Sequence, residues 1–282
     1  MAKGNLLLGT AGNSVGDVVM YRREGAQVSR VRVRKIKNPK TSAQSEQRAA
    51  FSPVAKFYSP LAVVLERSFE GLSKMKSYNK FLKTNIDLAR ANGWLLPKGT
   101  GFFPLPYKLS QGTLKTVGAH FNNTDYTIVL QMSNSFEAPT TIGAMSELFV
   151  GMGYNNGDIV TIVGTAKNGD NGYYPISVQF EIDTKSVVTL ATAIPSLTIN
   201  VSQGPYMLKL GFSGVTLAGG AIIVARFEND KWRRSTEFLA VSDALMTQIG
   251  SSDYKAAAVA SYGMNAGDPN PLVYLDGDTL EG

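Results

Sequence analysis

The spacing of apolar residues changes once along the chain, and this change constrains the fold more than any single motif does. Between residues 41 and 92 apolar side chains recur at helical spacing. Beyond residue 110 they alternate with polar ones, as in strands that have one buried face. The two patterns meet in residues 95–110, which are rich in proline and glycine. We therefore expect an α+β protein in which helices precede an antiparallel β domain.

A β-hairpin is predicted ahead of the helices, over residues 15–36. Residues 18–21 form its first strand, and residues 27–35 form the return strand. Residues 23–25 supply the turn, because Gly25 readily adopts a left-handed conformation. The hairpin is basic, and its charge is concentrated in the return strand.

The return strand carries the most distinctive local pattern of the chain. Arg30, Arg32 and Arg34 fall on one face, while Val31 and Val33 fall on the other. A row of arginines resists burial unless it meets an acidic or phosphate partner. The alternative is a charged edge strand that discourages unwanted strand pairing. We take the following residues as a candidate electrostatic contact strip: Arg30, Arg32, Arg34, Lys35 and Lys37.

Two helices should follow the hairpin. Thr41 and Gln44 have the spacing of a capping box, in which each side chain satisfies a backbone donor of the other residue. Pro53 and Pro60 should kink the first helix or break it into two pieces. A second helix is expected over residues 74–92, where an Asn-Gly pair forms a C-cap.

The second half of the chain predicts a β-sandwich. The candidate strands are residues 113–120, 125–132, 147–153, 158–164, 176–182, 207–212, 221–227 and 232–241. Asn-Gly, Gly-Asp and Asn-Asp turns lie between several of them. Short strands joined in this way indicate an antiparallel sandwich of immunoglobulin-like or related topology.

Three parts of the chain follow from these patterns. Residues 1–97 form a basic hairpin and helical assembly module, and residues 98–241 form the β-sandwich domain. Residues 242–282 form a C-terminal arm with short helical stretches. Such an arm is either ordered against a neighbouring subunit or disordered in the free protein.

The net charge of +6 conceals opposite charges in the two halves. Residues 1–100 hold 18 Lys and Arg against 6 Asp and Glu, whereas residues 101–282 hold 10 against 16. A basic block of this kind can bind a polyanion such as nucleic acid. It equally lets identical subunits, or different proteins, dock a basic surface onto an acidic one. Independently solvated faces are the third interpretation.

The residue inventory argues against catalysis. The chain has no cysteine and a single histidine, His120, which excludes disulfides, thiolate metal sites and multi-histidine centres. Glu228, Asp230 and Glu237 are close in sequence, but the lysine and arginines beside them indicate cross-strand ion pairs around a turn rather than paired catalytic carboxylates. We predict that the protein is not an enzyme and uses no cofactor or metal.

No apolar run in the sequence approaches the length of a membrane span. The run of three leucines near the N-terminus is too short for a signal-peptide core. We therefore expect a protein that is made in a cytoplasm and stays there, or in a particle assembled there.

The N-terminal residues resemble an uncharacterised family. The motif comprises residues 16–21, Gly25, residues 30–32, residues 38–44, Gln47, Arg48 and Phe51. Members of this family come from gut and environmental Bacteroidota and from their phages, including crAss-like phages. The resemblance covers roughly residues 10–90 and carries no assigned chemistry.

The resemblance implies a place in a phage virion. crAss-like phages have short tails joined to the capsid through stacked rings. A cysteine-free chain of this size with opposite charge blocks is similar to a subunit of such a ring. It implies a homo-oligomer that also contacts other virion proteins, with the strip facing an acidic neighbour or the DNA passage.

Two other functions stay open from the sequence. A nucleic-acid-binding protein would use the same basic strip, although the strip lacks the interleaved aromatics of single-strand binders. A host- or glycan-binding β-domain would instead use loop aromatics such as Tyr154, Tyr173 and Tyr174.

Overall fold

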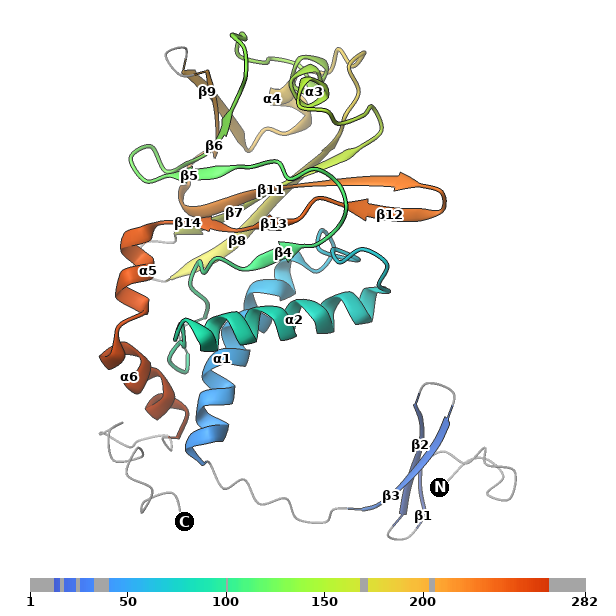
Figure 1. Ribbon diagram of the computed structural model, residues 1–282, viewed down its shortest axis with the longest axis vertical. Helices are drawn as coiled ribbons and strands as arrows, with labels where there is room; N and C mark the ends of the chain where they lie inside the picture. Colours follow the sequence, from blue (N-terminus) through green and yellow to red (C-terminus); the bar gives the residue numbers. More distant parts are fainter. Residues whose placement is uncertain are drawn as a thin grey trace. The chain divides into compact units, whose positions relative to one another are not determined.

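The computed structural model describes residues 13–15, 18–23, 26–32, 41–99, 101–167, 172–202 and 206–263. The chain divides into two compact units, Met1–Pro39 together with Gly282, and Lys40–Glu281. The strands of the first unit are called the ribbon below, and the second unit is called the body. Figure 1 shows the elements of each.

The ribbon is a three-stranded antiparallel sheet in the order β1-β2-β3. Its strands are β1 (Asn13–Val15), β2 (Val18–Arg23) and β3 (Ala26–Val31). The predicted hairpin is confirmed, since Val18 pairs with Val31 and Arg23 with Ala26. The sequence did not predict β1, and the return strand ends earlier than expected. The predicted turn glycine, Gly25, lies outside the described residues.

The body begins with helix α1 (Ser42–Tyr58), which Thr41 caps by accepting a hydrogen bond from the Gln44 backbone at 3.4 Å. The reciprocal bond of the predicted box is not formed, because the buried Gln44 Oε1 has no partner. Of the two effects expected of Pro53, a break is wrong, because α1 continues through this residue, and a kink stays a prediction. The carbonyl that a proline leaves free, here that of Ala49, instead accepts a bond from Leu96 N at 3.4 Å.

Pro60 does end the first helix, as expected. It lies in the short 3₁₀ helix η1 (Ser59–Leu61) that follows α1. Helix α2 (Lys74–Ala91) is confirmed with Asn92 as its C-cap. Gly93 then takes the left-handed conformation at φ 67°, which a side chain rarely adopts.

Two antiparallel sheets form the β part of the body. The four-stranded sheet has the order β5 (His120–Asn122), β6 (Thr127–Gln131), β10 (Met207–Phe212) and β9 (Leu197–Ser202). The five-stranded sheet has the order β12 (Lys231–Arg234), β11 (Thr216–Glu228), β7 (Ile159–Lys167) and β8 (Tyr173–Glu181), with β14 (Ala240–Val241) on β11. A separate pair joins β4 (Lys108–Ser110) to β13 (Glu237–Phe238).

The five-stranded sheet lies between two apolar cores. One face of β7 and β11, with Ile162 and Ile222, packs in a core shared with the four-stranded sheet. The other face, with Val163 and Ala221, packs in a core shared with α1 and α2. The body is thus three layers, helices on sheet on sheet (Figure 1). The predicted α+β class and sandwich are confirmed.

One predicted strand is a helix. Residues 147–153 belong in part to α3 (Ile142–Gly151), which starts where Thr141 Oγ1 accepts a bond from Ala144 N at 3.1 Å. Met145 and Phe149, four positions apart, are buried in the sandwich core. The predicted strand at 113–120 is reduced to one bridge, between Leu114 and Ser235, before β5 begins. Short elements that the sequence did not predict are β4, β9 and α4 (Leu190–Ala193).

The stretch around residue 97 is part of a core rather than a linker. Leu96 and Leu105, on either side of it, are both buried in the core that α1 and α2 share with the sheet. The structural division therefore lies at Pro39/Lys40, not at 97/98.

The C-terminal arm is likewise part of the body as far as it is described. It forms α5 (Asp243–Ile249) and α6 (Ser252–Gly263). Ala258 of α6 and Ile249 of α5 are buried in the core that contains α1. Residues 264–282 lie outside the described residues.

Candidate interaction surfaces

The predicted contact strip is described only in part. Arg30 is exposed in β3, and Arg32 is exposed just beyond the end of that strand. Arg34, Lys35 and Lys37 lie outside the described residues. The strip as a whole therefore stays a prediction.

Arg30 shares its face of the ribbon with apolar side chains. Val19 lies opposite Arg30, and Tyr21 lies opposite Val28. These four residues project from the same face, because directly opposed residues of antiparallel strands do so. The Arg30 guanidinium carbon lies 5.8 Å from the centroid of the Tyr21 ring, within cation–π range. The basic strip is thus accompanied by one half-exposed aromatic ring.

The ribbon has no core among its described side chains. None of them is buried, and Val31 is 72% exposed. Small isolated sheets of this kind are marginally stable unless another surface covers one of their faces. The ribbon is therefore a surface suited to docking.

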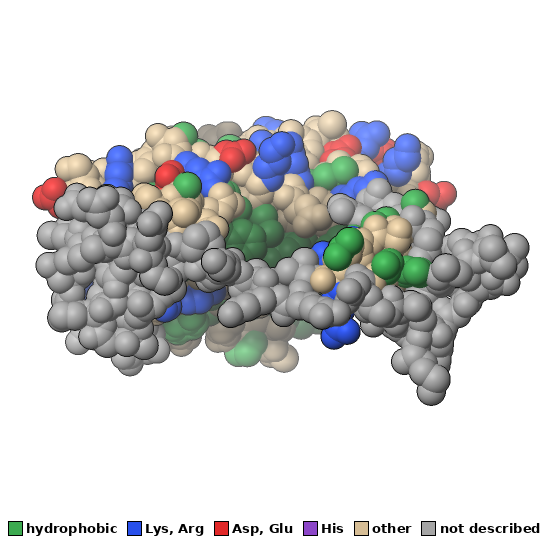
Figure 2. Space-filling model, turned by 90° about the horizontal axis from the view of Figure 1, so that it is seen from below, with side chains coloured by type: hydrophobic (Ala, Val, Ile, Leu, Met, Phe, Trp, Pro, Cys, Tyr) green, Lys and Arg blue, Asp and Glu red, His purple; other side chains and the backbone are tan. Residues whose placement is uncertain are grey.

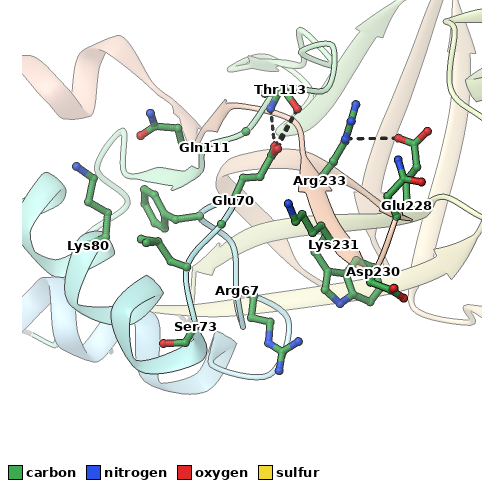
Figure 3. Close-up of a pocket in the computed structure, with 16 residues that line it drawn as sticks. Arg67, Glu70, Ser73, Lys80, Gln111, Thr113, Glu228, Asp230, Lys231 and Arg233 are labelled. Atoms are coloured by element: carbon green, nitrogen blue, oxygen red, sulfur yellow. Dashed lines mark hydrogen bonds and ion pairs between the residues drawn. The ribbon is translucent and has the colours of Figure 1, made fainter. Parts of the chain in front are cut away.

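A second candidate surface is an open groove of about 1210 Å³ in the body. Figure 3 shows it between the segment after η1 and the hairpin of β11 and β12. On one side lie Arg67, residues 69–73, Lys80 of α2 and residues 111–113, and on the other lie residues 228–233.

Backbone and side-chain bonds fix the walls of this groove. Glu70 accepts hydrogen bonds from Thr113 N at 2.8 Å and from Thr113 Oγ1 at 3.0 Å (Figure 3). The opposite wall is a tight hairpin, in which Asn229 and Asp230 have positive φ angles of 52° and 57°. Two such residues in succession match the right-handed twist of the flanking strands.

The groove carries charges of both signs. Its acidic groups are Glu70, Glu228 and Asp230, and its basic groups are Arg67, Lys80, Lys231 and Arg233. Arg233 pairs with Glu228 at 3.4 Å, which confirms the cross-strand ion pair predicted around this turn. Within the described part of the chain, Arg67, Lys80 and Lys231 have no acidic partner.

The three carboxylates near the C-terminal strands do not form one site. Glu228 is engaged with Arg233, whereas Glu237 is buried in β13, where it accepts a bond from Val117 N at 2.7 Å. Burial raises the pKa of Glu237 to about 7. Asp158, just before β7, is also buried and accepts two bonds of 2.7 Å from Arg226 of β11. Asp158 thus ties the start of β7 to β11, and Glu237 ties β13 to the segment before β5.

The loop aromatics considered for ligand binding do not gather at the surface. Tyr154 is buried and donates to Lys115 O at 3.0 Å. Tyr173 and Tyr174 lie in β8, and only Tyr174 is exposed. Among the described residues no group of three or more acidic or histidine side chains could hold a metal ion. No helix in the described ranges is long and apolar enough to cross a membrane.

The helical side of the body is basic but not uniformly so. Lys76 and Lys83 of α2 are exposed. Figure 2 shows Lys and Arg side chains along the upper edge of this view, with Asp and Glu side chains among them. Basic side chains therefore alternate with acidic ones along that edge.

Sequence reasoning missed the groove for a physical reason. Its walls come from segments more than a hundred residues apart, and only tertiary packing brings Arg67 close to Trp232. The one local signal was the run from Lys231 to Arg234 after an Asn-Asp turn, which predicted a hairpin but not its neighbour.

Comparison with known proteins gives one match. Residues 9–94 match the model of the "Family of unknown function (DUF6266)". The match covers less than half of the chain and extends over the ribbon, α1 and α2. No curated protein and no solved structure matches the chain.

Proposed function

We propose that the protein is a non-catalytic structural subunit of a bacteriophage virion. It forms part of a ring in the head–tail connector or tail, associates side by side with copies of itself and stacks on neighbouring rings. It is synthesised in the host cytoplasm and resides in the virion.

The observation that carries this proposal is a ribbon with no buried side chain among its described residues, next in the chain to a body with two cores. The body has two cores of its own, whereas no described side chain of the ribbon is buried. A sheet of this size becomes stable when it is laid on another surface. A second copy of the chain, or a neighbouring virion protein, would supply that surface.

The charge distribution supports the same proposal. The basic residues cluster toward the N-terminal part of the chain, and the remainder is acidic. Docking the ribbon of one copy onto the acidic part of the next gives complementary contacts around a closed ring. The placement in a phage rests on the resemblance of residues 10–90 to the Bacteroidota and phage family.

Light scattering of the purified protein at low and at moderate salt tests the proposal. We expect a large, discrete, closed oligomer whose mass falls when salt screens the opposed charges. A monomer at every salt concentration, also when mixed with the other virion proteins, would contradict it.

Reversing the charge of the contact strip tests whether the strip is the surface through which the subunits associate. The triple variant Arg30→Glu, Arg32→Glu and Arg34→Glu should abolish assembly and leave the unfolding transition of the body in place. A matched control makes the same charge change at exposed positions of α1 and α2 outside the groove, with Lys56→Glu, Lys76→Glu and Lys83→Glu. Normal incorporation of the arginine variant into particles would rule the strip out.

A nucleic-acid-binding function is the second candidate, because Tyr21 lies against Arg30. An aromatic ring beside a basic strip is what a binder of single strands uses to stack a base. A steeply salt-dependent affinity for DNA that disappears in Tyr21→Ala would favour this function over assembly.

A further inference from the structure

A small hollow of about 200 Å³ lies beside the groove, on the helix side of the five-stranded sheet. Its sheet wall includes Trp232 and Arg234 of β12 and Gln179 of β8. Its other wall is the segment after η1, which contributes Arg67. The residues that line this hollow all belong to the body, so this inference does not rest on the proposed assembly function.

Arg234 is an unusual residue in this hollow because it is buried without a carboxylate. It is 9% exposed, and its guanidinium carbon lies 4.9 Å from the centroid of the Trp232 ring. One Nη donates to the Glu66 carbonyl at a long 3.4 Å, while the buried Nε has no partner. The Glu66 carboxylate instead pairs with Lys74 at 3.1 Å. Burying a cation in this way is costly unless an anion compensates it.

Arg67 adds a second positive charge to the same hollow. It is exposed, it has no acidic partner within the described ranges, and its φ of 53° is rare for a residue with a side chain. Burial first, and the charge of Arg67 second, lower the pKa of Arg234 to about 10. Arg234 is still cationic at neutral pH, so two arginines line one hollow, and the buried one has an unpaired Nε.

We propose that this hollow binds an oxyanion, a carboxylate or a phosphate group, between Arg67 and Arg234. The planar guanidinium suits both groups, because it donates two parallel hydrogen bonds to a pair of oxygens. The Trp232 ring forms the wall that fixes the orientation of Arg234. The volume is below the roughly 300 Å³ of a typical small-molecule pocket, so the ligand enters as a single group and not as a whole cofactor.

Tryptophan fluorescence of the full-length chain tests this site. The sequence has two tryptophans, so the variant Trp94→Phe leaves Trp232 as the only one. Inorganic phosphate and acetate are titrated separately at constant ionic strength, with chloride as the balancing ion. We expect a saturable change with at least one of them. A tighter response to phosphate identifies a phosphate group as the ligand, and an equal or tighter response to acetate identifies a carboxylate.

Charge-removing variants decide whether the response comes from the hollow. In the Trp94→Phe background, Arg67→Gln should weaken binding about tenfold, because one charge-assisted bond is lost. Arg67 is exposed, so this variant tests the site even if Arg234→Met fails to fold. Lys83→Gln removes the same charge from an exposed position outside the hollow and should leave binding unchanged. No saturable change with either anion, or equal binding in Arg67→Gln, overturns the proposal.

Discussion

The ribbon and the body of this chain differ in where their stability comes from. In the body, β7 and β11 bury side chains on both faces, and the helices and a second sheet cover them. In the ribbon, paired strands of similar regularity have no buried side chain among the described residues. Both regions have regular backbone hydrogen bonds, so these bonds do not explain why the body is stable by itself. The difference between the two regions is the burial of apolar side chains.

The largest expected effect comes from removing the ribbon altogether. A chain that starts at Lys40 should unfold at the same urea concentration as the full chain, because both cores are retained. It should no longer form oligomers in light scattering. A truncated chain that loses stability by several kcal/mol would mean that the ribbon belongs to the fold of the body.

A core substitution should affect only the body. Phe57 is fully buried, with ring centroids of Tyr107 at 4.5 Å and Phe102 at 5.3 Å. Phe57→Ala should lower the free energy of unfolding by about 3–5 kcal/mol, through lost burial and the cavity left behind. Urea denaturation followed by circular dichroism measures this loss.

The matched substitution in the ribbon is Val31→Ala. Because Val31 is 72% exposed, its loss should change the free energy of unfolding by less than about 0.5 kcal/mol. The same variant should weaken self-association if that face is covered in the assembly. A large loss of monomer stability would show that the ribbon has a core of its own. The claim that only the body is stabilised by apolar burial would then be wrong.

The stability of the body should also depend on pH through Glu237. Burial raises the pKa of Glu237 from 4.5 to about 7, so between these values the folded protein binds more protons than the unfolded chain. The stabilisation that comes from the raised pKa of Glu237 is complete below about pH 4.5 and is lost as the pH rises through 7. The free energy of unfolding should therefore fall by up to about 3 kcal/mol between pH 5 and pH 8.

Glu237→Gln provides the control for this pH dependence. The amide is neutral at every pH and can still accept the bond from Val117 N. The variant should remove most of the slope in urea unfolding between pH 5 and pH 8. An unchanged slope would assign the dependence to other groups. The oligomer mass should depend on salt in the same way in the unchanged chain and in Glu237→Gln. Glu237 is buried in the body, so it takes no part in contacts between subunits.

Sequence reasoning found the elements whose signals are local. The hairpin of β2 and β3, the Thr41 cap and the C-cap of α2 were predicted, because turn glycines, caps and spacing act within a few residues. The strand predicted at 147–153 was wrong because a short apolar run fits a buried helix as well as a strand. The division at 97/98 was misplaced because proline and glycine also occur where a chain crosses a core.

The candidate surfaces divide in the same way. Arg30 and Arg32 were predicted as contact residues from a pattern within one strand, and that role stays a prediction. The hollow at Arg67 and Arg234 was not, because the two arginines are separated by more than 160 residues and meet only through packing of the η1 segment against β12. A buried cation without an acidic partner is a property of three-dimensional surroundings, and no spacing in the sequence reports it.

A small effect is also expected at the start of α1, just after the division of the chain at Pro39/Lys40. Thr41→Ala removes the N-cap and should lower the free energy of unfolding of the body by about 0.5–1 kcal/mol, without changing oligomer mass. Gln44→Ala is the informative companion, because the Gln44 side chain does not complete the capping box and its buried oxygen is unpaired. That variant should be neutral or slightly stabilising in urea denaturation. Equal losses from both variants would mean that the full box forms in solution, and that the start of α1 is held more firmly than its single 3.4 Å bond implies.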